Sequence, residues 1–345
     1  MRQTSFHLAT LVWLIIDAGC RHIHTRESPT FTATTMDSKD DDLSIALGEF
    51  GLDLKNTDLN SVLQHKKPDY ISFRGKDIQE HHSLQHSVVK YLLQYGYLET
   101  VKQKTEKELG DTVIEEGDLS AALKRYQTLF SLEVTGTVTE ETLVKMREAR
   151  CGIKDEEFIA STSRVKRYTV KRKLWKKKRL FYWFDPKKYS GKMPKATQRQ
   201  VLEKSMELWA KVAGVTFIEL PANRGRRADI KISFERGSHG DKYPFDGSGG
   251  IVAHAFFPRK GLLHFDDSED FTTETTNGIN LHFIATHELG HILGIDHTFH
   301  EDAIMFPLYS RVYPDKIELA DDDKSAARVA MGGGVGRVVP LRKWS

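Results

Sequence analysis

Four residues near the end of the sequence have the types and spacing of a metal-dependent hydrolytic site. His287 and His291 are four residues apart, Glu288 stands between them, and His297 follows six residues after His291. Positions i and i+4 of an α-helix lie on one face, so both imidazoles can reach one metal ion. Glu288 projects about 100° around the helix axis. It would therefore lie beside the metal as a base and not as a ligand.

The third histidine can join the same ion only if the helix ends after His291. Gly294 supplies that end, because glycine tolerates the positive φ of a sharp turn. Three protein ligands leave one position for water, which is typical of catalytic zinc. Surface histidines can form a bare His-Glu-x-x-His by accident, but Gly294 and His297 at this spacing make an accident a poor explanation.

This arrangement predicts hydrolysis of peptide bonds. A bound zinc ion lowers the pKa of its water and polarises the carbonyl that is attacked. Glu288 would accept the proton of that water and return it to the leaving amine. The sequence therefore indicates a zinc-dependent endopeptidase with Glu288 as its catalytic base.

The composition indicates a secreted chain of more than one compact unit. Of 345 residues, 39% are hydrophobic and 29% are charged, which is too polar for a membrane bundle. The 51 basic and 48 acidic residues give a net charge of +3, which does not point to nucleic acid. Residues 1–20 have a basic start and a short apolar core, so we interpret them as a signal peptide. No later segment predicts a transmembrane anchor.

Cysteine content raises a question about Cys151. The sequence has two cysteines, and the other, Cys20, lies at the signal boundary. After signal cleavage, Cys151 would be the only thiol in an oxidising compartment. A partner other than sulfur is then expected.

The middle of the chain predicts a leader and a helical prodomain. Residues 21–82 lack a sustained apolar period and are interpreted as a flexible leader. Residues 83–167 carry three helical stripes, around 88–95, 119–130 and 143–146. They end in a basic segment in which Arg164 to Arg167 matches the recognition sequence of secretory proprotein convertases. Cleavage after Arg167 is preferred over a merely solvated charge run.

Residues 168–333 predict an α+β catalytic domain, followed by a short tail at 334–345. Strand patterns cover 180–184, 215–220, 230–234 and 251–257, and helical patterns cover 197–213 and 281–293. Mixed strands and helices over this length favour an α+β fold.

The histidine run and Met305, eight residues after His297, resemble the metzincin peptidases, in which a methionine turn lies beneath the zinc ligands. Pro307 and Tyr309 resemble the outer wall of the specificity pocket in one branch, the matrixins or matrix metalloproteinases. Tyr91–Leu98 and Val134–Gly136 resemble the matrixin prodomain, so the resemblance covers about residues 83–332. It implies a metzincin catalytic domain, a twisted mixed sheet plus helices, preceded by a three-helix prodomain.

Other branches fit less well, and one common domain is not expected. The astacin-like pattern has Glu where this chain has Thr298, and adamalysin-like domains carry disulfides, whereas the predicted catalytic domain has no cysteine. The chain ends after a glycine-rich stretch, so we expect it to lack the hemopexin-like domain of many matrixins. A helix over 319–332 follows the matrixin register, although Ala327 and Ala330 replace larger residues there. Asp322 and Asp323 are candidates to pair with the new amino terminus at Tyr168.

Residues 150–155 resemble the matrixin cysteine switch. The resemblance implies that the Cys151 thiolate occupies the fourth position of the catalytic zinc in a latent form, which is the expected non-sulfur partner. It also implies that Arg150 and Asp155 pair. Ala149 and Lys154 stand where the family has prolines, which predicts a less rigid loop.

Two more metal sites are implied by resemblance. A structural zinc would be held by four protein ligands with no open position, namely His239, Asp241, His254 and His264. At least one calcium would be held by oxygen atoms of Asp246, Gly247, Gly249, Ile251, Asp266 and Glu269. A plain glycine-rich turn competes with the calcium interpretation. The short segment 255–263 predicts that a second calcium site is missing or altered.

The leading hypothesis is therefore a secreted matrixin made as a latent zymogen, with two zinc ions and calcium. It would cleave proteins of the extracellular matrix, collagen among them, or other extracellular proteins. Substrates would lie against Val252 and Ala253 with Pro307 and Tyr309 at the pocket, and an apolar residue would be preferred after the scissile bond. Proteinaceous inhibitors and a monomeric state are expected. The alternative is a non-catalytic protein on a metzincin scaffold that binds matrix glycosaminoglycan through seven basic residues in 171–179. A solvated strand edge also explains those residues, and Glu288 argues against a scaffold.

Overall fold

The computed structural model describes residues 70–72, 80–98, 113–155, 169–171, 174–309 and 312–340. All of them belong to one unit of the chain, Leu59–Ser345. The predicted signal peptide, the leader up to residue 69, the convertase site and Tyr168 lie outside the described residues. In the described part, no helix is both long and apolar enough to cross a membrane.

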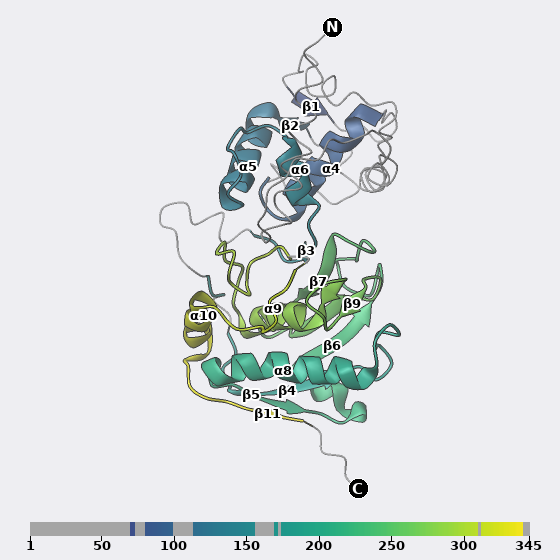
Figure 1. Cartoon of the computed structure of the whole chain (residues 1–345), viewed down its shortest axis with the longest axis vertical. Coiled ribbons are helices and arrows are strands. Elements are labelled where there is room, and N and C mark those ends of the chain that lie inside the picture. Colours follow the sequence, from purple (N-terminus) through teal and green to yellow (C-terminus); the bar gives the residue numbers. More distant parts are fainter. Residues whose placement is uncertain are drawn as a thin grey trace, which may run out of the picture. The chain divides into compact units, whose positions relative to one another are not determined.

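The three helical stripes of the predicted prodomain form three helices (Figure 1). These are α4 (Glu80–Gln94), α5 (Glu116–Leu129) and α6 (Glu140–Met146), and a short antiparallel pair joins β1 (Tyr70–Ser72) to β2 (Val113–Glu115). The Thr139 hydroxyl accepts a hydrogen bond from the Thr142 amide at 3.2 Å and so caps α6. Leu92, Tyr126 and Phe130 are buried in a shared core, which confirms the predicted apolar faces.

A seven-stranded mixed sheet is the framework of the second part. Its strand order is β11-β5-β4-β6-β8-β7-β3, with only β7 and β8 antiparallel to each other. The strands are β3 (Arg150–Cys151), β4 (Arg179–Phe184), β5 (Thr216–Glu219), β6 (Ile230–Glu235), β7 (Ile251–Ala255), β8 (Leu262–Asp266) and β11 (Val338–Val339). A 3-10 helix, η2 (Ala222–Arg227), follows β5, and a small parallel pair joins β9 (Phe271–Thr272) to β10 (Ile279–Asn280).

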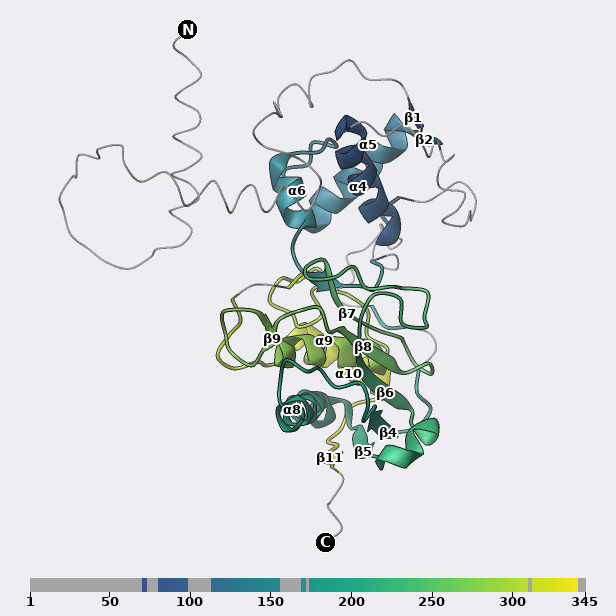
Figure 2. The same ribbon diagram turned by 90° about the vertical axis from the view of Figure 1, so that its right-hand side faces the viewer.

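Two long helices, α8 (Lys195–Ala213) and α9 (Leu281–Leu293), lie on one side of the sheet (Figure 2). The Trp209 indole of α8 donates a hydrogen bond to the Thr286 carbonyl of α9 at 2.8 Å. At Gly290, an added Cβ would collide with the Met305 sulfur, so Met305 packs directly beneath α9. The predicted α+β fold is confirmed, and its four predicted strands and two predicted helices are all present.

Helix α10 (Asp321–Met331) ties the C-terminal segment to the turn that contains Met305. The buried Asp323 carboxylate accepts hydrogen bonds from the amides of Ile304, Met305 and Ala320 at 2.8–3.2 Å. Ala327 and Ala330 are buried, so small residues fill this interface. Asp323 therefore positions the methionine turn. Its predicted pairing with the amino terminus at Tyr168 stays a prediction, because Tyr168 lies outside the described residues.

Candidate functional site

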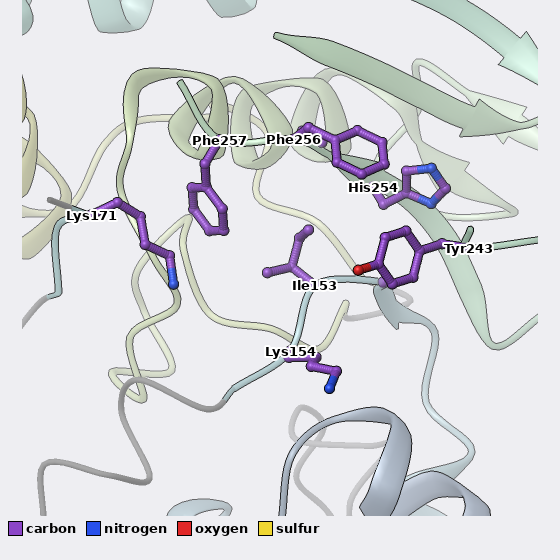
Figure 3. A pocket seen from close by; sticks show the side chains of 9 residues that line it. Ile153, Lys154, Lys171, Tyr243, His254, Phe256 and Phe257 are labelled. Atoms are coloured by element: carbon purple, nitrogen blue, oxygen red, sulfur yellow. The ribbon is translucent and has the colours of Figure 1, made fainter. Parts of the chain in front are cut away.

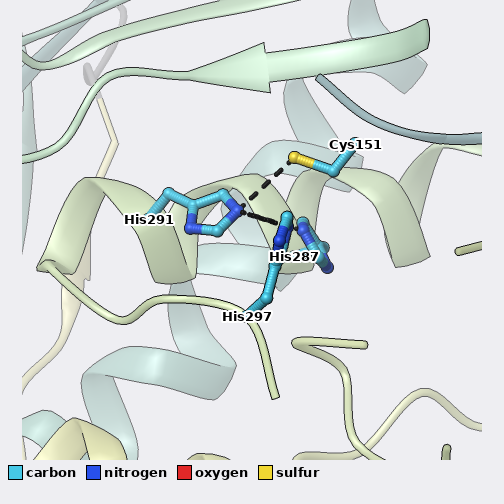
Figure 4. A group of neighbouring side chains, drawn as sticks. All are labelled: Cys151, His287, His291 and His297. Atoms are coloured by element: carbon cyan, nitrogen blue, oxygen red, sulfur yellow. Dashed lines mark hydrogen bonds between the residues drawn. The ribbon is translucent and has the colours of Figure 1, made fainter. Parts of the chain in front are cut away.

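Three buried histidines and one cysteine converge above α9 (Figure 4). His287 and His291 lie one turn apart on α9, and Gly294 ends the helix with φ 98°, which returns the chain to His297. The Nε2 atom of His291 lies 3.2 Å from Nε2 of both other histidines. Cys151 Sγ lies 3.4 Å from the same atom.

The hydrogen bonds of these imidazoles show that the cluster suits a cation. His287 Nδ1 donates to the Ile304 carbonyl at 2.7 Å and His291 Nδ1 donates to the Ile295 carbonyl at 2.8 Å. A neutral imidazole with a proton on Nδ1 has a lone pair on Nε2. Burial lowers the pKa of both side chains, which keeps them neutral. Their Nε2 lone pairs therefore face each other and repel unless a cation lies between them.

The spacing and chemistry of the four donor atoms fit zinc. Tetrahedral zinc with bonds of about 2.0–2.1 Å to nitrogen separates two ligand nitrogens by roughly 3.4 Å. The observed separations of 3.2 Å lie close to that value. Three imidazole nitrogens and a sulfur are also ligands that zinc prefers.

Glu288 lies beside the cluster and is fully buried. Its Oε1 atom accepts a hydrogen bond from the Tyr309 hydroxyl at 3.0 Å, and its Oε2 atom has no hydrogen-bond partner among the described residues. Burial raises the pKa of Glu288 to about 8. A zinc ion nearby would lower that pKa, because a cation favours the charged carboxylate. A buried carboxyl with one uncommitted oxygen suits proton transfer.

Cys151 lies on β3, which pairs parallel with β7 through Arg150↔Ile251 and Cys151↔Ala253. The Cys151 amide donates to the Pro307 carbonyl at 3.0 Å, and the Gly152 amide donates to the Ala253 carbonyl at 2.9 Å. On the other side, the Tyr309 amide donates to the Ala149 carbonyl at 2.7 Å. Residues 149–152 thus lie between the strand and the loop that the sequence predicted to bind substrate.

The Arg150–Asp155 pair implied by resemblance is present, with Nη2 3.0 Å from Oδ2. Burial raises the pKa of Asp155, but Arg150 and the hydrogen bonds of His297 and Tyr97 outweigh it and hold that pKa at about 2. Tyr97 donates its hydroxyl to Oδ2 at 2.7 Å, and His297 Nδ1 lies 2.7 Å from Oδ1. The Arg150 guanidinium also lies 3.4 Å from the centre of the Tyr95 ring.

Sequence reasoning missed several of these supporting contacts. Tyr95 and Tyr97 were recognised only as part of a prodomain pattern, and the hydrogen bonds of Asp155 to His297 and of Tyr309 to Glu288 were not foreseen. Tyr91 and Tyr95 stand four residues apart and so share a helix face. Two tyrosines on one face of a predicted helix were the available signal for a buried polar partner.

A second cluster brings together His239, Asp241, His254 and His264. Asp241 Oδ2 lies 3.0 Å from a ring nitrogen of each histidine. The histidine nitrogens lie 3.1–3.4 Å from one another. Burial and the two neighbouring histidines lower the pKa of His264 to about 4. Four neutral or anionic donors at tetrahedral spacing fit a zinc ion without an open position.

Two carboxylates of the predicted calcium site, those of Asp246 and Glu269, accept hydrogen bonds from backbone amides of the same loop. Asp246 accepts from the Ile251 amide at 3.0 Å, and Glu269 accepts from the Gly249 amide at 2.6 Å. Burial, with Asp266 and Asp246 nearby, raises the pKa of Glu269 to about 7. Gly247 and Gly249 have φ of 101° and 87°, which a plain turn would also require. The described part of the chain does not bring these three carboxylates together as closely as the donors of the two histidine clusters, so the calcium site stays a prediction and a glycine-rich turn remains its competitor.

A cavity of about 200 Å³ lies beside the segment 152–154, which follows Cys151 (Figure 3). Tyr243, Phe256 and Phe257 line its catalytic-domain side, and Ile153 and Lys154 line its propeptide side. The cavity therefore offers aromatic walls to the segment that follows Cys151.

Known proteins share this sequence pattern. A sequence model of the family described as matrixin matches residues 174–330. The chain is 35% identical over 263 residues to matrix metalloproteinase-C of Caenorhabditis elegans, covering 72% of this chain and 43% of that protein. It is 34% identical over 258 residues to the interstitial collagenase of Equus caballus, covering 74% and 50%. Over 249 residues it is 33% identical to matrix metalloproteinase-16 of Homo sapiens, covering 69% and 40%. The chain thus spans half or less of the length of these relatives.

Proposed function

Because the chain belongs to the matrixin family through residues 174–330, we propose that it is a zinc-dependent endopeptidase made as a latent precursor. The convergence of three histidine nitrogens and the Cys151 sulfur, with the buried Glu288 beside them, carries this proposal. Three histidines would hold a catalytic zinc whose fourth position is taken by Cys151 until the propeptide leaves.

When bound, the zinc ion supplies a water of lowered pKa and polarises the scissile carbonyl. Glu288 takes the proton of the attacking water through its uncommitted oxygen and delivers it to the leaving amine. Tyr309 orients Glu288 through the hydrogen bond to Oε1. The carbonyls of Ala253 and Pro307, which now bind the propeptide, are free to bind a substrate backbone after its removal.

The setting of this activity follows from the same proposal. The chain enters the secretory pathway through residues 1–20, a proprotein convertase cleaves it after Arg167, and it acts as a monomer on collagen or other extracellular matrix proteins. Proteinaceous inhibitors that occupy the cleft restrain it. One of the relatives is named an interstitial collagenase, and this name supports a protein of the extracellular matrix as the substrate.

Incubation of the convertase-processed chain with a mixture of peptides tests the proposal. Mass spectrometry is expected to detect cleavage before apolar residues at neutral pH, because the predicted pocket beyond the scissile bond is apolar. A zinc chelator should stop cleavage and added zinc should restore it. Cleavage that persists after full removal of zinc would refute the proposal.

The second histidine cluster gives a separate prediction about metal content. Replacing His264 by Ala removes one of four ligands and is expected to lower the zinc content from two ions to one per chain, and to lower the melting temperature. Elemental analysis and thermal unfolding measure both effects. His300→Ala is the matched control, because His300 belongs to neither cluster. An unchanged zinc content in His264→Ala would show that this cluster does not bind zinc.

Glycosaminoglycan binding is a second candidate function, favoured by the basic surface around β4. Lys176–Arg179 are exposed at the start of β4, and η2 holds the exposed Arg224, Arg226 and Arg227 near Trp183, towards the end of the same strand. The Trp183 indole of β4 donates a hydrogen bond to the Ala222 carbonyl at 2.9 Å, and Gly225 approaches the Trp183 ring. Arginines are well suited to bind sulfate groups through paired hydrogen bonds.

Heparin chromatography of the full chain tests this surface. Replacing Arg224, Arg226 and Arg227 together by Ala is expected to lower the salt concentration of elution, because charge pairing supplies the affinity. The control replaces three other exposed cations, Lys187, Lys211 and Lys242, and matches the loss of charge. Equal shifts in both triple variants would show a net-charge effect and contradict a defined site.

A further inference from the structure

The three zinc-binding imidazoles differ in what holds their second nitrogen. His287 and His291 donate from Nδ1 to backbone carbonyls of Ile304 and Ile295, which lie in the catalytic domain. The Nδ1 of His297 instead lies 2.7 Å from Oδ1 of Asp155, which belongs to the propeptide segment. One ligand of the catalytic domain is therefore oriented by a residue that leaves with the propeptide.

Asp155 is held firmly enough to act on His297. Its side chain is fully buried, and both of its oxygens lie within 3.1 Å of Arg150 Nη2. The Tyr97 hydroxyl donates to Oδ2 at 2.7 Å, and the Asp155 amide donates to the Tyr95 carbonyl at 3.0 Å. Arginine, tyrosine and backbone thus leave Oδ1 aimed at the imidazole.

A carboxylate that accepts a hydrogen bond from Nδ1 strengthens a histidine as a metal ligand more than a backbone carbonyl does. It fixes the tautomer and ring orientation, and its negative charge makes Nε2 a stronger donor to the metal. Loss of such a partner typically lowers metal affinity by about 10–100-fold. The effect depends on the charge of Asp155 and not on the Cys151 ligand.

We propose that Asp155 is a positioning residue for His297, so that the propeptide segment tightens zinc binding in the latent chain as well as blocking it through Cys151. This inference rests on the proposed function, since it needs zinc at the three histidines. It gives the propeptide a second task, which is to retain the metal until activation. Removal of the propeptide then removes both the blocking thiolate and the carboxylate that supports His297.

Zinc release from the uncleaved chain tests the inference without measuring activity. Arg167→Ala keeps the chain uncleaved, and zinc transfer to excess chromophoric chelator is followed in time. The zinc that the parent chain contains and a His291→Ala variant lacks is assigned to the catalytic site. In this background, Asp155→Asn is expected to release catalytic-site zinc about tenfold faster or more.

Asp155 also pairs with Arg150, so its loss could act only by loosening Cys151. A double-mutant cycle separates the two routes. If Asp155 acts through His297, Asp155→Asn accelerates release in a Cys151→Ser background by a similar factor. Asp118→Asn is the matched control, because it makes the same change at an exposed position of α5, away from His297. Its release rate is expected to stay close to that of the parent.

Each outcome has a distinct meaning. Acceleration by Asp155→Asn in both backgrounds supports the inference, and acceleration that vanishes in Cys151→Ser overturns it. If Asp155→Asn does not fold, Asp155→Glu replaces it, since the longer arm retains a charge for Arg150 but displaces the oxygen from Nδ1, and the same acceleration is expected. An unchanged zinc content in His291→Ala would instead refute the proposed function itself.

Discussion

Replacing Glu288 by Ala is expected to reduce peptide hydrolysis by the processed chain by about 10³-fold, while zinc stays bound. Glu288 lies next to the ligand His287 in the sequence but outside the cluster of four donor atoms. Its loss therefore removes proton transfer and leaves metal binding intact. Hydrolysis of a fluorogenic peptide and zinc analysis of the same sample measure the two effects.

Glu288→Gln sharpens this prediction because it keeps the shape of the side chain. Glutamine can still accept the Tyr309 hydrogen bond, but it cannot take a proton from water. Both variants should therefore lose activity to a similar extent. Glu207→Ala, at an exposed position on α8, is the control and should retain activity. Substantial hydrolysis by Glu288→Gln would show that another group is the base.

Replacing Cys151 by Ala in a chain that also carries Arg167→Ala is expected to raise the activity of the uncleaved chain by about tenfold or more. The tethered thiolate competes with water at a high effective concentration, and alanine removes this competition. The Cys151 sulfur lies 3.4 Å from His291 Nε2, where it would occupy the fourth zinc position. A continuous peptide assay of the two uncleaved proteins measures the gain.

The gain should stay below the activity of the convertase-processed chain. The backbone of 150–152 still forms hydrogen bonds to the carbonyls of Gly250, Ala253 and Pro307, and so still obstructs the cleft. Glu133→Ala, at an exposed propeptide position, is the control and should remain latent. If Cys151→Ala leaves the uncleaved chain inactive, the backbone alone maintains latency and the thiolate is not the switch.

In the switch, Ala149 and Lys154 replace prolines of the family pattern, which predicted a looser loop. The Ala149 carbonyl accepts a hydrogen bond from the Tyr309 amide, and Asp155 next to Lys154 is held by Arg150 and Tyr97. Both contacts would also form with proline at positions 149 and 154, because proline keeps its carbonyl group, so the structure does not explain these two departures.

The elements that the sequence predicted well are those whose signals are local. Helix α9 spans Leu281–Leu293, as its pattern predicted, and Gly294 ends it in the left-handed region. The four-residue spacing of His287 and His291 already implied a shared face. Strand β8 was missed, because the short run Leu262–Asp266 lies between turns and its burial depends on β6 and β7 on either side.

By itself, the sequence determined the helix that carries His287, Glu288 and His291 and the alternation of strands and helices, because helical and strand periodicity act between near neighbours. The cysteine count indicated a non-sulfur partner for Cys151, but only the resemblance to a family pointed to zinc as that partner and to the second histidine set. Tertiary structure decided that Cys151 reaches His291 across 140 residues and that Asp155 reaches His297 across 142. No local period records such contacts, since they arise only when β3 pairs with β7 and the helices of the propeptide bury Arg150.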